Sequence, residues 1–99
     1  MPVSPAPYDS GNTASTVTVG NITTSDVQVL ASSVRRKRLM LWNNDSVAIY
    51  VSFGDTCTTT NASMALAASG GYFVIDGYAG PVRATVASGT ATLWITEWA

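Results

Sequence analysis

Residues 38–54 constrain the fold more than any other part of the chain, because they hold two runs of alternating apolar residues. Leu39 and Leu41 share one face of the first run, and the matching face of the second run carries Val47, Ile49, Val51 and Phe53. A period of two is typical of a β-strand with one buried face. Residues 43–46 (Asn-Asn-Asp-Ser) favour a tight turn. The pattern predicts two strands joined by that turn, as a β-hairpin.

The opposite face of this predicted hairpin is also apolar. It carries Met40, Trp42 and Tyr50, which is unusual for a surface that faces water. A hairpin with two apolar faces needs a partner on each side. We expect one partner to be the rest of the domain and the other to be a second protein chain.

The rest of the chain repeats the same pattern of short strands. Turn residues separate the apolar runs at intervals of about ten residues, which is typical of β-sandwiches and barrels. Further strands are expected at residues 17–19, 27–30, 64–67, 72–75, 82–86 and 91–98. No helical periodicity is present. The sequence predicts an all-β fold, a single antiparallel β-sandwich or barrel-like domain of seven or eight short strands.

The first 16 residues differ from the rest of the chain. They contain three of its four prolines, which favour an extended arm over a core strand. We expect an N-terminal arm over residues 1–16 and one domain over 17–99. The arm is either a disordered tail or a segment that lies across a neighbouring subunit, with Tyr8 as its anchor.

Composition indicates a globular protein that suits an assembly. Only 11% of the residues are charged and 46% are hydrophobic, with a formal net charge of −1, whereas soluble monomers usually carry more net charge. The start lacks the basic and apolar regions of a signal peptide. No apolar run approaches the roughly 20 residues of a membrane-spanning helix. We therefore expect no membrane association.

The residues needed for common catalytic chemistry are scarce. The chain has no histidine and six scattered acidic residues, so the usual general base and most transition-metal sites are missing. Cys57 is the single cysteine, which excludes an intrachain disulfide and fits a reducing compartment. We expect an inert thiol, no cofactor, no metal and no enzymatic activity.

Four of the five basic residues stand together, as Arg35, Arg36, Lys37 and Arg38. Such a run can indicate nucleic-acid binding, but it is short, no second basic patch supports it, and the sequence pI is 4.9. We expect no nucleic-acid partner. The run is expected to pair with acidic groups on a neighbour or to solvate the entry of the following strand.

Trp42, Trp94 and Trp98 all fall on the outward faces of their predicted strands. Exposed apolar patches mark protein contacts or ligand grooves, and Trp and Tyr are enriched at binding hot spots. These aromatics could contact other subunits or form a stacking platform for a sugar ring. A sugar site would need Asp, Asn, Glu or Arg between the rings to bond hydroxyls, but the strands around Trp94 and Trp98 offer mainly threonine. Subunit contact is therefore favoured.

Several segments together resemble small β-sandwich proteins encoded among the virion structural genes of tailed bacteriophages. These are an Arg-led strand ending in Asn (38–43), a Tyr-Val-Ser-Phe-Gly strand (50–54), a Gly-led strand (71–73) and a Ser-Gly-Thr-Ala turn (88–91) before the last strand. The resemblance covers residues 27–98 and leaves the arm outside.

The resemblance implies a non-enzymatic virion protein, assembled in the bacterial cytoplasm. We expect a capsid decoration (cement) protein that contacts the major capsid protein and copies of itself, often as a homotrimer in such proteins. A head fibre, collar or tail component, or a carbohydrate-binding module on a spike, is the alternative. The residues expected at subunit or capsid contacts are Tyr8, Arg35, Arg36, Lys37, Arg38, Met40, Trp42, Tyr50, Trp94 and Trp98.

Overall fold

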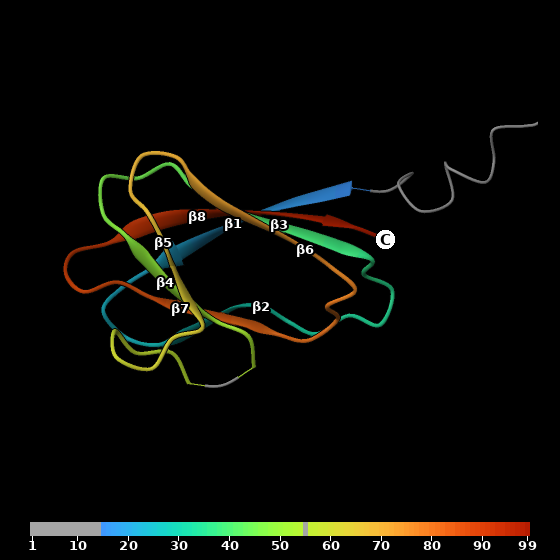
Figure 1. The fold of residues 1–99 in the computed structure, drawn as a ribbon, viewed down its shortest axis with the longest axis horizontal. Helices are drawn as coiled ribbons and strands as arrows, with labels where there is room; N and C mark the ends of the chain where they lie inside the picture. The colour runs from blue at the N-terminus through green and yellow to red at the C-terminus, as the bar shows by residue number, and fades with distance from the viewer. Residues whose placement is uncertain (1–14, 55) are drawn as a thin grey trace, which may run out of the picture.

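The computed structural model describes residues 15–54 and 56–99, and over these residues it consists of eight β-strands and no helix (Figure 1). Two four-stranded antiparallel sheets pack face to face, which confirms the predicted all-β sandwich. The strands are β1 (Ser15–Ile22), β2 (Val27–Leu30), β3 (Arg38–Asn43), β4 (Ile49–Ser52), β5 (Met64–Leu66), β6 (Gly71–Asp76), β7 (Val82–Thr85) and β8 (Ala91–Trp98).

The strand order defines an eight-stranded jelly roll. Sheet I has the order β1-β8-β3-β6 and sheet II the order β2-β7-β4-β5. Consecutive strands therefore alternate between the sheets, except for β4 and β5, which are neighbours in sheet II. This double Greek-key arrangement is the one that jelly rolls share.

The predicted hairpin between the strands at 38–54 is wrong, although both strands are present. β3 lies in sheet I between β8 and β6, whereas β4 lies in sheet II between β7 and β5. The polar segment between them carries the chain from one sheet to the other. Met40 and Trp42 therefore do not share a face with Tyr50.

Asn43 holds this corner in place. Its side chain is fully buried, and its amide nitrogen donates to the carbonyls of Val47, Leu66 and Ala67 at 2.9, 3.1 and 3.1 Å. Its amide oxygen accepts from the backbone N–H of Asp45. The side chain thus ties the segment between β3 and β4 to the end of β5.

The core lies between the inner faces of the two sheets. The apolar residues predicted to face inward in β3, β7 and β8 are all buried, whereas the inward residues Phe73 and Ile75 of β6 are half-buried. The fully buried aliphatic side chains are Ile22, Leu39, Leu41, Ile49, Val51, Val82, Ala84, Val86, Leu93 and Ile95. The outward residues of sheet I form a second, separate apolar surface.

Candidate interaction surface

The outer face of sheet I is lined with aromatic and apolar side chains. Strand register places Trp42 of β3 directly between Trp94 of β8 and Tyr72 of β6. One step along the strands, Met40 lies opposite Val74. We call the outward residues Met40, Trp42, Tyr72, Val74, Trp94 and Trp98 the aromatic face.

This face is open to solvent in the single chain. Tyr72 is 68% exposed, Val74 43% and Trp94 38%. The alternation that buries Leu39, Leu41 and Phe73 against sheet II forces their neighbours outward. A contiguous exposed patch of this kind is uncommon on monomeric soluble proteins and marks interaction sites.

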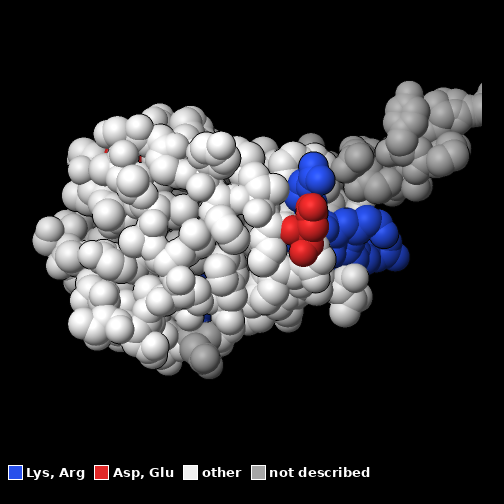
Figure 2. Space-filling view, viewed as in Figure 1, with Lys and Arg blue, Asp and Glu red and all other residues white. Residues whose placement is uncertain are grey.

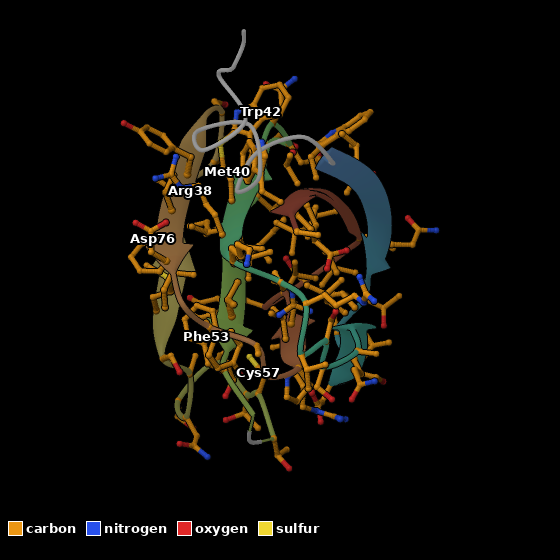
Figure 3. All side chains as sticks on the ribbon, turned by 90° about the vertical axis from the view of Figure 1, so that its right-hand side faces the viewer. Arg38, Met40, Trp42, Phe53, Cys57 and Asp76 are labelled. Atoms are coloured by element: carbon orange, nitrogen blue, oxygen red, sulfur yellow. The ribbon has the colours of Figure 1, made fainter. Side chains whose placement is uncertain are left out.

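A groove crosses the aromatic face between β3 and β6. Met40, Trp42 and Tyr72 line its volume of about 390 Å³. The Trp42 and Trp94 rings lie beside it, with centroids 6.2 Å apart and planes tilted by 44°. Figure 3 shows Met40 and Trp42 together on the upper side of the molecule, away from Phe53 and Cys57. None of the three lining side chains is charged, so the groove suits an apolar ligand.

An exposed ion pair borders this face. Arg38 Nε donates to Asp76 Oδ1 at 2.7 Å across the β3–β6 pair, where the two residues are register partners. The hydrogen bond to Asp76 raises the pKa of the Arg38 guanidinium. Because both side chains are about half or more exposed, the pair contributes little to stability. The Arg38–Asp76 pair forms a polar edge of the aromatic face.

Arg36 has a different role from the expected one. It is 4% exposed, and its Nε donates to Glu97 Oε1 at 2.9 Å. Its Nη atoms donate to the carbonyls of Ala31, Gly80 and Tyr78 at 2.6, 2.8 and 3.3 Å. The prediction that Arg36 pairs with a neighbouring subunit is therefore wrong, because its guanidinium is buried and bonded within its own chain.

The other basic residues lie on the surface at the same end of the sandwich. Arg35 and Lys37 are exposed, and Val34 beside them is 98% exposed. Figure 2 shows Lys and Arg side chains gathered at this end, with acidic side chains next to them. Arg35 and Lys37 remain candidates for contact with acidic groups.

Tyr50 lies on the outer face of sheet II, in a setting unlike that of the tryptophans. Cys57 Sγ donates to the Tyr50 carbonyl at 3.2 Å, so the loop after β4 folds over this face. Asp26 and Arg83 form a two-pronged ion pair nearby, with contacts of 2.8 to 3.0 Å. Burial raises the pKa of the Cys57 thiol, which keeps it in its unreactive form.

Sequence reasoning missed Tyr72 and Val74, the two most exposed members of the aromatic face. The period-two pattern of this strand could have revealed them, because Tyr72 and Val74 alternate with the inward residues Phe73 and Ile75. Trp42, Trp94 and Trp98 lie on the outer face of sheet I, as predicted, with Trp98 next to Arg38 in register. Tyr8, predicted to anchor the arm, lies outside the described residues.

No metal-binding group of three or more His, Cys, Asp or Glu side chains occurs among residues 15–54 and 56–99. The same part of the chain has no helix of the length and hydropathy needed to cross a membrane.

No family model matches this sequence and no curated protein matches it significantly. Among solved structures, one from work on Bacillus endospore appendages, presented as a novel family of disulfide-linked pili, superposes with a TM-score of 0.55 at 14% identity. The match covers 86% of this chain and 83% of that one. At this identity the likeness shows the fold alone.

A second structure, of Co(II) HppE in complex with substrate, reaches a TM-score of 0.44 at 15% identity, over 87% of this chain and 53% of that chain. A likeness this weak carries no argument about function.

Proposed function

We propose that this chain is a non-enzymatic structural protein of a bacteriophage virion, and that it binds the outside of the capsid as a decoration protein. The observation that carries the proposal is the aromatic face, with its uncharged groove between Met40, Trp42 and Tyr72. The phage setting rests on the sequence resemblance described above.

The physical mechanism is the burial of this face against other subunits. Apolar surface removed from water contributes roughly 25 cal/mol per Å². Part of this gain is offset by the cost of association, so aromatic anchors carry most of the affinity. Tyr72 and Trp94 are exposed in the single chain and have the most surface to lose on binding. Repetition over many copies would stabilise a shell against internal pressure.

The fold is compatible with an assembly role but does not establish it, because jelly rolls serve many functions. The structurally similar pilus protein comes from a disulfide-linked assembly. That linkage does not transfer, since Cys57 is the only cysteine and is 1% exposed. Assembly of this chain would depend on non-covalent contacts.

The decisive experiment is the copy number of the chain in purified particles, measured by quantitative mass spectrometry against the major capsid protein. A ratio near one, or a simple fraction of one, supports a decoration protein. A handful of copies would move the chain to a fibre, collar or tail. Absence from particles would overturn the virion proposal.

A carbohydrate-binding role on a spike is the second candidate, because the exposed Trp94 ring and the half-buried Trp42 ring lie side by side and could stack on a sugar. Against it, the groove lining has no charged group, and the nearby Arg38 and Asp76 are already paired. Quenching of tryptophan fluorescence by members of a broad glycan panel would support this role. Unchanged emission across the panel would exclude it.

A further inference from the structure

We propose that the groove of Met40, Trp42 and Tyr72 binds the proline-rich segment of residues 2–8 from a second copy of this chain. The inference deepens the proposed assembly role and rests on it. It assigns a specific occupant to the groove and a specific function to the N-terminal arm.

The chemistry of the groove fits a proline-rich strand. Grooves lined by aromatic side chains bind proline-rich segments, because flat rings pack on pyrrolidine rings and the segment loses little entropy on binding. Trp42 and Tyr72 supply two rings on neighbouring strands, and Met40 supplies an adaptable apolar floor. The Trp and Tyr rings also carry polar hydrogens that can donate to carbonyls of a bound backbone.

The chemistry of the arm fits the groove. Residues 2–8 read Pro-Val-Ser-Pro-Ala-Pro-Tyr, so two prolines stand three residues apart, the spacing that places them on one edge of a polyproline helix. The segment contains no charged residue. Nothing in its composition would oppose entry into an apolar site.

The position of Ser15, where the arm joins the domain, favours binding of the arm to the groove of a neighbouring copy over binding to the groove of its own chain. Ser15 pairs with Trp98 and Val19 with Trp94, so β1 enters sheet I at the level of Arg38 and runs toward the level of the groove. The residues that line the groove lie two to four positions farther along the strands than Ser15, roughly 7–14 Å, and about 12 Å across them, so the straight-line distance is roughly 14–18 Å.

Residues 9–14 would have to cover this distance after reversing direction. A tight turn alone takes four residues, so binding to the groove of the same chain requires a reversal directly before Ser15. A groove on a copy that lies ahead of β1 has no such limit.

The test is a complementation experiment with two full domains. One variant lacks residues 2–8 and keeps the groove; the other, Trp42→Thr/Tyr72→Ser, keeps the arm and lacks the groove. Neither variant should self-associate in sedimentation equilibrium, and their mixture should form a one-to-one pair. Val34→Ser, which removes a 98% exposed apolar side chain outside the face, is the control and should assemble like the unaltered chain.

A peptide experiment guards against misfolding of the double variant. The synthetic peptide of residues 2–8 should change the tryptophan emission of the arm-deleted protein in a saturable way. The single change Tyr72→Ser, at a 68% exposed position, should weaken this binding about tenfold, the effect of losing one aromatic anchor. A peptide with alanine at all three prolines should not bind.

Three results would overturn the proposal. Self-association that persists without the arm would mean that the aromatic faces of two copies contact each other directly. Peptide binding by the arm-deleted protein, combined with a monomeric full-length chain, would mean that the arm folds back on its own groove. No peptide binding would mean that the groove serves another partner. If the chain is present on particles but the two variants fail to complement each other, this inference is wrong and the proposed function still stands.

Discussion

Replacing Arg36 by Met should cost more stability than any other change in the basic run. Met keeps an unbranched apolar stem in place of that of arginine but removes the guanidinium. Glu97 then loses its ion-pair partner at 2.9 Å, and the carbonyls of Ala31 and Gly80 lose donors at 2.6 and 2.8 Å. Breaking a buried ion pair by removing one partner costs about 3–5 kcal/mol.

The structure places the expected loss in the lower half of this range. The Glu97 side chain is 22% exposed, so water can reach its carboxylate once Arg36 is gone. We therefore expect a loss of about 3–4 kcal/mol, a large part of the roughly 5–15 kcal/mol that stabilises a domain. In urea this corresponds to a midpoint lower by about 1–4 M, at the slope of about 1–3 kcal/mol/M that small domains show.

The measurement is equilibrium unfolding in urea, followed by tryptophan emission. Arg35→Met is the matched control: the residue is adjacent and exposed, so its change should stay within about 0.5 kcal/mol. Arg36→Met/Glu97→Gln closes a double-mutant cycle and should show a coupling of about 1–2 kcal/mol. A loss below about 1 kcal/mol for Arg36→Met, with an unchanged control, would refute the assigned role.

Three further predictions concern single side chains. Asn43→Leu should lower the free energy of unfolding by about 2–4 kcal/mol in thermal melts, because one buried and two partly buried carbonyls lose their donor; a neutral result would contradict the role of Asn43 at the corner. The hydrogen bond from Arg83 holds the pKa of Asp26 below its usual 3.8, so the stabilisation is complete above that value and is lost as pH falls through the lowered pKa; the advantage over Asp26→Asn should shrink in acid urea titrations. Cys57 should resist a thiol-specific disulfide reagent in the native protein and react fully in urea, since it is buried and its pKa is raised; rapid labelling of the native protein would contradict this.

The strands could be predicted from the sequence because their signal is local. Alternation in β3, β7 and β8 correctly indicated which residues face inward, and it correctly placed Trp42 and Trp94 outside. Pairing could not be predicted in the same way. Turn residues such as Asn43 favour a chain reversal, but a hairpin and a corner between sheets need the same residue types. The outcome depends on Leu66 and Ala67, whose carbonyls Asn43 binds far along the chain.

The buried role of Arg36 was hidden for a related reason. Its neighbours Arg35 and Lys37 are chemically similar and exposed, so the run gives no sign that one member differs. Burial is decided by three carbonyls and Glu97, which come together only when the loops before β3 and β7 meet the end of β8. Such convergence is a property of tertiary structure and has no local pattern.

The position of β8 inside sheet I has a consequence for biosynthesis. β8 pairs with β1 on one side and β3 on the other, so the sheet cannot close until residues 91–98 have left the ribosome. Until then β1 has no partner in sheet I, and Trp42 lacks its neighbour Trp94. The aromatic face therefore gains Trp94 and Trp98 only when β8 is in place, whereas the groove between β3 and β6 needs neither of them.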